Sequence, residues 1–227
     1  MAYALHRFAV LSVLSAWLYG SAAVAQPEHG QAERATQILR EVDDLWRGSS
    51  SHARVAMQVK TEHYTRNMKM EAWSKGKEET LVRIVAPLKE KGIATLKSGN
   101  NIFTYLPRTD RTIRLTSGMM LGSWMGSHFT NDDLVKEFSL FEDYTYEMIR
   151  PEGAVDSLLY INCIPREDLP IVWGNIVFTA RKKDHLPVQA KYYDEKGELM
   201  RVLNYKDIRD FGGRVIPATL EMVPTNK

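Results

Sequence analysis

The sequence predicts a mostly β protein of the α+β class. We expect a curved antiparallel sheet of about ten or eleven strands that forms a half-closed barrel, with one or two helices covering its open, apolar side. Three observations support this: apolar residues alternate with period two along most of the chain, turn residues separate these stretches, and one long segment has a helical period. The chain lacks a strand–helix–strand rhythm, which favours hairpin connections.

The helical segment spans residues 31–46, where apolar residues recur at spacings of three and four and charged residues occupy the other side. Gly48 follows as a natural stop. The predicted apolar face consists of Ala35, Ile38, Leu39, Val42, Leu45 and Trp46.

The strand pattern begins at Ser51, where Val55, Met57 and Val59 alternate with more polar neighbours. Further strands are expected at 69–74, 79–86, 92–98, 101–106, 112–115, 144–150, 157–164, 173–181, 187–194, 199–208 and 215–224. Residues typical of tight turns stand between them at 75–77, 98–100, 107–110, 195–197 and 211–213. Because a sheet with so many strands tends to curl, a helix against its inner face would give a half-closed barrel.

The first 25 residues are expected to be a cleaved signal peptide and not part of the fold. His6 and Arg7 form a basic start, residues 8–19 are an apolar run, and an Ala-x-Ala site places cleavage after Ala25. The run is shorter than the ~20 residues that a membrane-spanning helix needs. We therefore expect an exported single domain over residues 26–227, without stable membrane insertion after cleavage; a retained N-terminal anchor is the alternative.

The charge balance gives no electrostatic argument for a nucleic acid partner. The chain has 30 Lys and Arg against 28 Asp and Glu, and removal of Arg7 with the signal peptide leaves 29 − 28 = +1. Nucleic acid binding would require a clustered basic face. The single cysteine, Cys163, has no partner for a disulfide within the chain and lies in an apolar run, so we expect a buried, inert thiol.

Enzyme motifs are missing from the sequence. The histidines are scattered without a His-x-x-x-His pattern, and no Cys-x-x-Cys pair exists, so no metal site is predicted. The chain contains neither a Gly-x-Ser-x-Gly elbow nor a phosphate-binding glycine loop. We expect no catalytic residues and no cofactor.

The most unusual segment is the glycine-rich loop, defined here as residues 118–129. Methionine packs against variable shapes and is common at adaptable binding surfaces, and glycine gives the backbone freedom to hinge. The functional interpretation is a mobile apolar lid that contacts a lipid chain; the alternative is a loop that only covers the core. The candidate lipid-binding residues are Met119, Met120, Leu121, Trp124, Met125 and Phe129, and the candidate hinges are Gly118, Gly122 and Gly126.

A helix start follows the loop. Thr130 and Asp133 have the spacing of a capping box and precede the apolar residues Leu134, Val135 and Phe138, so a short helix is expected to close the loop. Asp132 and Asp133 together are a pair of carboxylates, but capping of the helix start is the simpler account of them.

Three groups of residues resemble the periplasmic lipoprotein-carrier superfamily, which includes the LolA-like outer-membrane lipoprotein-sorting proteins. The first is the Arg-x-x-x-Pro of 83–87 followed by 98–107, which contains a glycine turn and ends in Tyr-x-Pro. The second is the glycine-rich loop with 130–134. The third is 184–187, 193–197 and 212–217. Within the superfamily the pattern is most similar to the branch whose members accompany large lipid-exporting transporters.

The resemblance implies a periplasmic carrier that binds a lipid or lipid-modified protein through its acyl chains and moves it between the inner membrane, or a transporter there, and the outer membrane. It also implies a lid-locking arginine on an early strand, for which Arg54 is the nearest candidate without a secure alignment. Two other functions stay open. One is a periplasmic sensor of the same fold that captures lipid or envelope protein and signals to a membrane partner. The other is an enzyme acting on envelope lipids.

Overall fold

The computed structural model describes residues 27–47, 49–76, 78–99, 101–120, 122–131, 133, 144–167, 171 and 173–225. The predicted signal peptide with its cleavage site after Ala25, the helix stop Gly48, and the lid candidate Leu121 lie outside the described residues. The predicted helix beyond Asp133 also lies outside them.

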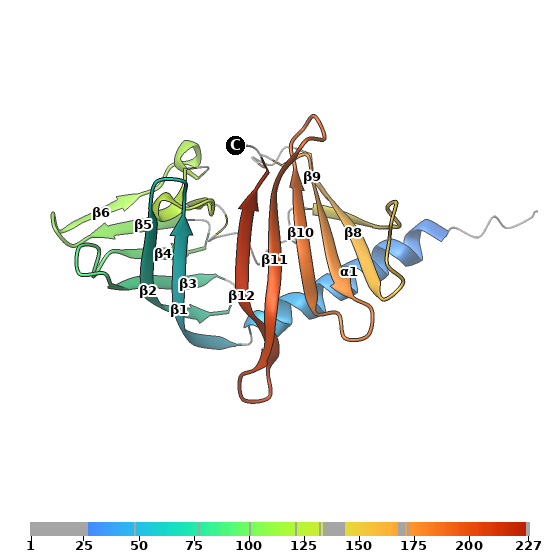
Figure 1. The fold of residues 1–227 in the computed structure, drawn as a ribbon, viewed down its shortest axis with the longest axis horizontal. Coiled ribbons are helices and arrows are strands. Elements are labelled where there is room, and N and C mark those ends of the chain that lie inside the picture. Colours follow the sequence, from blue (N-terminus) through green and yellow to red (C-terminus); the bar gives the residue numbers. More distant parts are fainter. Residues whose placement is uncertain are drawn as a thin grey trace, which may run out of the picture.

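One long helix, α1 (Pro27–Arg47), opens the described chain. It begins four residues before the predicted start, and proline suits this position because the first helical N–H groups have no partner within the helix. The predicted apolar face is buried at Ala35, Ile38, Leu39 and Val42. In Figure 1, α1 passes behind the strands drawn from orange to red, and it contacts β7 and β12, the two edges of that sheet.

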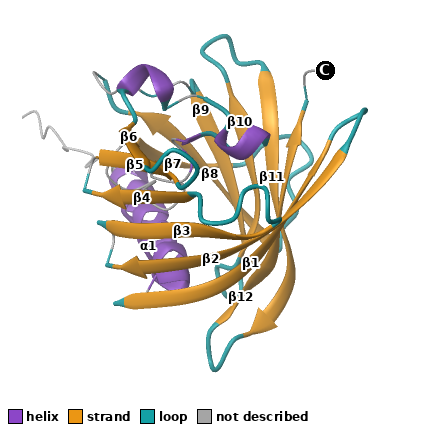
Figure 2. Cartoon of the chain, turned by 90° about the vertical axis from the view of Figure 1, so that its left-hand side faces the viewer, coloured by secondary structure: helices purple, strands orange, loops and turns teal. Residues whose placement is uncertain are grey.

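The strands form two antiparallel sheets, each with its strands in chain order. The first sheet contains β1 (Ser50–Lys60), β2 (Thr65–Lys75), β3 (Glu79–Ala86), β4 (Ala94–Ser98), β5 (Asn101–Leu106) and β6 (Arg111–Arg114). The second contains β7 (Tyr144–Ile149), β8 (Leu158–Pro165), β9 (Asn175–Arg181), β10 (Pro187–Tyr193), β11 (Leu199–Asp210) and β12 (Val215–Pro224). In Figure 2 the strands of the first sheet lie in front, and α1 is seen behind them.

The predicted fold class is confirmed: the protein is mostly β, antiparallel and helix-covered. The described residues hold twelve strands, and they divide into two six-stranded sheets with no ladder between β1 and β12 or between β6 and β7. The division falls at the glycine-rich loop, where the alternating pattern stops. The described strands therefore leave the barrel open.

Each sheet has a hydrophobic cluster of different composition. The cluster of the second sheet, the α1 cluster, joins the buried face of α1 to aliphatic and aromatic side chains such as Ile161, Phe178 and Leu203. The cluster of the first sheet, the methionine cluster, is smaller. Its buried members are Val59, Met68, Met70, Ile84 and Trp124, and Met57, Val82, Ile93 and Met125 pack against them in part.

A turn of the second sheet contacts α1. His185, in the turn between β9 and β10, contacts Glu41 of α1 at 2.5 Å between Nδ1 and Oε2, and this hydrogen bond lowers the pKa of the Glu41 carboxyl. β11 bends at Asp207, which has a φ of 55° and no partner in the ladder to β12. No helix in the described part of the chain is long and apolar enough to cross a membrane.

Cys163 on β8 is fully buried in the α1 cluster, and burial raises the pKa of its thiol. Because the thiolate is the reactive form, we expect the native protein to leave a thiol reagent such as Ellman's unconsumed at pH 8. The same protein in guanidinium should consume one equivalent per chain. Rapid labelling without denaturant would contradict the buried position of β8.

Candidate functional site

The glycine-rich loop connects the two clusters. Trp124 and Met125 belong to or pack on the methionine cluster of the first sheet, whereas Phe129 packs on the α1 cluster of the second. The described part of the loop contains two short 3₁₀ turns, Ser117–Met119 and Trp124–Gly126. A span of six residues from Trp124 to Phe129 thus reaches from one core to the other.

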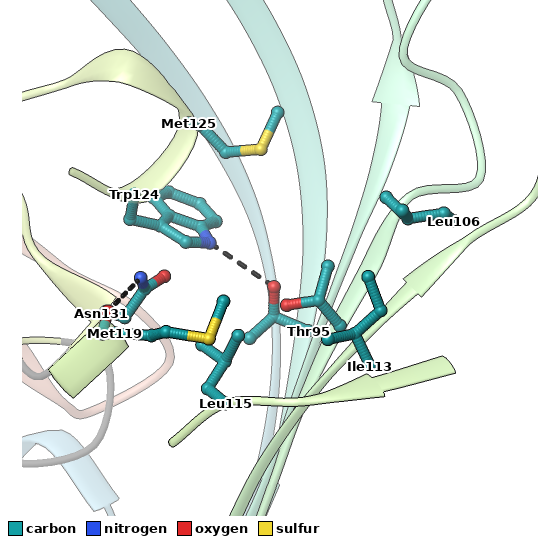
Figure 3. Close-up of a pocket in the computed structure, with 9 residues that line it drawn as sticks. Thr95, Leu106, Ile113, Leu115, Met119, Trp124, Met125 and Asn131 are labelled. Carbon is teal, nitrogen blue, oxygen red and sulfur yellow. Dashed lines mark hydrogen bonds between the residues drawn. The ribbon is translucent and has the colours of Figure 1, made fainter. Parts of the chain in front are cut away.

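Trp124 anchors the loop on the first sheet. Its side chain is 7% exposed, and its Nε1 donates a hydrogen bond to Thr95 Oγ1 of β4 at 3.3 Å (Figure 3). The next two residues turn the chain sharply, since Met125 has a φ of 52° and Gly126 a φ of 68°. Ser127 closes this turn by donating from its backbone N and its hydroxyl to the Trp124 carbonyl. A buried side chain and local hydrogen bonds therefore hold this part of the loop on the first sheet.

Arg66 of β2 holds the loop from the side of the first sheet. One guanidinium nitrogen donates to the backbone carbonyl of Met125, and another contacts Glu90 Oε1 at 3.3 Å in the turn between β3 and β4. Arg66 Nε and Glu90 Oε2 are buried, and the described residues offer them no hydrogen-bond partner. This contact, which we call the Arg66 latch, is thus incompletely hydrogen-bonded.

Arg201 of β11 holds the other end of the loop. Its Nη1 donates to the His128 carbonyl at 3.0 Å and to Asp133 Oδ2 at 2.7 Å, and its Nη2 donates to Asp133 Oδ1 at 2.5 Å. The two side chains are 6% and 8% exposed, so the pair is buried. We call this bidentate contact the Arg201 latch. Removal of one partner from such a buried pair leaves an uncompensated charge, which is strongly destabilising.

Asp133 also caps the chain at this point. The Thr130 backbone N donates to Asp133 Oδ2 at 2.7 Å, and the Asp133 backbone N donates to Thr130 Oγ1 at 3.1 Å. This reciprocal arrangement is the predicted capping box, which is confirmed. The carboxylate therefore accepts hydrogen bonds both from its own chain segment and from the second sheet.

Two adjacent aromatic rings contact the Arg201 guanidinium. Its Cζ lies 4.4 Å from the ring centroid of Trp173 and 4.3 Å from that of Tyr192, and the two rings contact each other edge to face. The two rings add cation–π attraction to the ion pair. We call Arg201, Trp173 and Tyr192 the arginine cage.

An open pocket of about 250 Å³ lies between the loop and strands β4 to β6 (Figure 3). Met119, Trp124 and Met125 of the loop form one side, and Asn131 stands at its end. Asn131 donates to the Met119 carbonyl at 3.0 Å and so fixes the start of the loop. The remaining lining residues are Thr95, Thr104, Leu106, Ile113 and Leu115.

The candidate residues of the loop differ in their exposure. Met119 is 44% exposed, Met120, Met125 and Phe129 are half-buried, and Trp124 is buried. Only Gly126 among the candidate hinges has a positive φ. A Cβ at Gly122 would come within 3.1 Å of the Met119 carbonyl, whereas one at Gly118 would meet nothing within 4 Å. The lid and hinge roles of these residues remain proposals.

The two latch arginines were not singled out from the sequence. Arg54, the nearest candidate for a locking residue, is 85% exposed and reaches only Glu71 at 3.9 Å. Arg66 shares its strand phase with the buried Met68 and Met70, and Arg201 shares its phase with the buried Leu203. The sequence signal that could have identified both arginines is a charged residue at an inward-facing position of an alternating strand.

The described residues contain no group of three His, Cys, Asp or Glu side chains that could hold a metal ion. The ion pairs nearest to the loop are the two latches, and both hold backbone carbonyls of the loop. The chemistry of the site consists of apolar contact, charge pairing and hydrogen bonding.

Comparison with solved structures identifies proteins of similar fold. A LolA superfamily protein from Nitrosomonas europaea matches with a TM-score of 0.70 and 22% identity, over 85% of this chain and 86% of that chain. A putative outer membrane lipoprotein-sorting protein domain from Vibrio parahaemolyticus has a TM-score of 0.73 and 22% identity, and a DUF1329 family protein from Desulfovibrio piger has 0.76 and 18%; each match covers 86% of both chains. No curated protein matches the sequence.

The resemblance to the lipoprotein-carrier superfamily is thus confirmed in the fold. A family model described as an uncharacterized protein matches residues 76–227, which include strands β3 to β12, the glycine-rich loop and the arginine cage. The chain belongs to this family of uncharacterized proteins and has a LolA-like fold.

Proposed function

We propose that this protein is an exported periplasmic carrier that holds the acyl chains of a lipid or lipid-modified protein between its two sheets. It moves this cargo between the inner membrane, or a lipid-exporting transporter there, and the outer membrane. The observation that carries the proposal is the glycine-rich loop, which covers a methionine-rich cluster and is held by one arginine from each sheet.

The composition of the methionine cluster supports binding of variable chains. Met68 and Met70 are buried there, Met57 and Met125 pack against them, and Met119 lines the adjacent pocket. Unbranched, polarizable methionine side chains repack around different shapes at low cost. Branched and aromatic side chains dominate the α1 cluster instead, so the adaptable half of the molecule is the half that the loop covers.

The pocket in this structure is too small for two acyl chains. Its volume of about 250 Å³ is below the ~300–1,000 Å³ that is usual for ligand pockets. The loop must therefore lift from the methionine cluster before acyl chains enter. Burial of acyl methylenes contributes about 0.8 kcal/mol each, so complete burial of two chains would release on the order of 20 kcal/mol and make unloading too slow. The cost of opening a closed loop offsets part of this gain.

The two latches differ in a way that suggests where opening begins. Arg66 donates to one loop carbonyl, and its latch leaves two buried polar atoms without hydrogen-bond partners among the described residues. Arg201 donates to a loop carbonyl and to both oxygens of a carboxylate, and two aromatic rings contact its guanidinium. Because the first contact is the less satisfied, the loop is expected to lift from the first sheet first.

Binding of acyl chains is the direct test of the proposal. Protein purified from its own periplasm should carry lipid mass in native mass spectrometry, and delipidated protein should enhance the fluorescence of an environment-sensitive fatty acid. A clean apo mass together with no fluorescence gain would reject the carrier function. Turnover of an envelope lipid by the same protein would instead favour the enzyme interpretation.

Arg66→Gln tests the role of the weaker latch. The substitution removes the charged contact to Glu90 and weakens the hold on the Met125 carbonyl, so the closed state should lose about 1–3 kcal/mol. We expect faster and tighter uptake of the fluorescent fatty acid in stopped-flow and equilibrium titrations. Arg54→Gln is the matched control, because Arg54 lies on the neighbouring strand and is 85% exposed. Equal effects of the two variants would disprove a latch at Arg66.

Met119→Ser tests the pocket rim without disturbing the core. Met119 lines the pocket and is 44% exposed, so its loss should weaken fatty-acid binding severalfold and shift the thermal midpoint little. Val155→Ser, which removes a side chain 52% exposed in the turn before β8, should leave binding unchanged. Trp124→Ser is expected to unfold the loop, because Trp124 is buried and hydrogen-bonded. A binding loss shared by Met119→Ser and Val155→Ser would point to a nonspecific apolar surface.

A further inference from the structure

The arginine cage has the geometry of an oxyanion-binding site. The guanidinium presents two nitrogens to two carboxylate oxygens at 2.7 and 2.5 Å, and the centroids of two aromatic rings lie 4.4 and 4.3 Å from its Cζ. A planar fork of this kind recognises a carboxylate or a phosphate through paired charged hydrogen bonds. In the closed state, the carboxylate in the fork is Asp133.

The donor and the acceptor of this pair belong to different parts of the molecule. Arg201 and Tyr192 lie on β11 and β10, and Trp173 stands just before β9, so the whole cage belongs to the second sheet. Asp133 follows the glycine-rich loop, 68 residues earlier in the chain than Arg201. When the loop lifts, Asp133 is the member of the pair that leaves. The cage stays with the sheet that carries it.

An open cage would lose the bidentate carboxylate of Asp133. Arg201 is 5% exposed and lies on the inward face of β11 with Leu203, beside the α1 cluster that Trp173 and Tyr192 help to form. Loss of such an anion from a buried cation is strongly unfavourable. The open state is therefore stabilised by any ligand that supplies an oxyanion at this position, and the favoured ligand also has an apolar part to place under the loop.

We infer that the arginine cage binds the oxyanion headgroup of the cargo, a phosphodiester or a carboxylate, and that Asp133 occupies this site in the closed protein as an internal competitor. The inference rests on the proposed carrier function and adds a headgroup class to it. Loading then exchanges one oxyanion for another on Arg201, so the buried charge keeps a partner in both the empty and the loaded protein.

Three ligands with the same palmitoyl chain separate headgroup from chain: palmitate supplies a carboxylate, palmitoyl-lysophosphatidylglycerol a phosphodiester, and monopalmitoylglycerol no oxyanion. Their dissociation constants are measured below the micellar concentration, by displacement of the fluorescent fatty acid. The quantity of interest is the affinity for each charged ligand divided by the affinity for the neutral one. Comparison of the two charged ligands identifies the source of the oxyanion.

Asp133→Asn keeps the shape of the side chain and an oxygen for the Thr130 N–H, but removes the competing charge. We expect it to raise the affinity ratio about tenfold, the effect of one additional charge-assisted hydrogen bond. Arg201→Gln should reduce the ratio to about one, also in combination with Asp133→Asn. Arg66→Gln is the matched control, since it loosens the loop away from the cage and should raise all three affinities by the same factor.

The outcomes distinguish this inference from the carrier function itself. A ratio that neither Asp133→Asn nor Arg201→Gln changes would overturn the headgroup site, while binding of monopalmitoylglycerol would still support the carrier. A failure of all three ligands to bind any variant would overturn both. If Arg201→Gln does not fold, Asp133→Asn alone decides, because an unchanged ratio in that variant is incompatible with internal competition.

Discussion

The fold depends on how two separate sheets are kept together across an interface without a hydrogen-bond ladder. Hydrogen bonds stabilise each six-stranded sheet from within, but the described strands of one sheet do not pair with those of the other. The glycine-rich loop contributes a side chain to each core and is held by an arginine from each sheet. Arg66 and Arg201 fix the position of the loop, because each donates hydrogen bonds to one loop carbonyl and one carboxylate. Apolar contact alone would let the loop settle in several positions.

The two cores suit different tasks. In the α1 cluster, side chains such as Phe178 and Leu203 are almost fully buried around the helix, as expected of a core with one stable packing. The methionine cluster is smaller, and one of its buried members, Trp124, comes from the loop and not from a strand of the first sheet. A part of the molecule that must change shape is drawn from its less stable regions. The difference between the cores agrees with a rigid half that carries the cage and an adaptable half that admits chains.

Most of the secondary structure could be predicted from the sequence, because alternating burial along β8 to β10 and glycine turns with positive φ act within a few residues. The capping box at Thr130 and Asp133 is equally local. The break into two sheets is different, since it depends on which edges remain unpaired. The Arg201 latch joins residues 68 apart in the chain, so sequence spacing contains no record of it. Residue type identified Trp124 and Met125 as loop candidates but not their burial, which depends on the strands beneath them.

The open edges of the sheets have a consequence for self-association. Edge strands are templates for pairing with another chain, and the described sheets have four of them: β1, β6, β7 and β12. Pro217 and Pro224 deprive β12 of two backbone donors, and the bend at Asp207 distorts its neighbour. β6 has only four residues, two of which are arginine. The separation of the sheets that would let a cargo enter is thus accompanied, at β6 and β12, by edges poorly suited to pairing with a second copy, and a carrier that opens repeatedly would need such protection against aggregation.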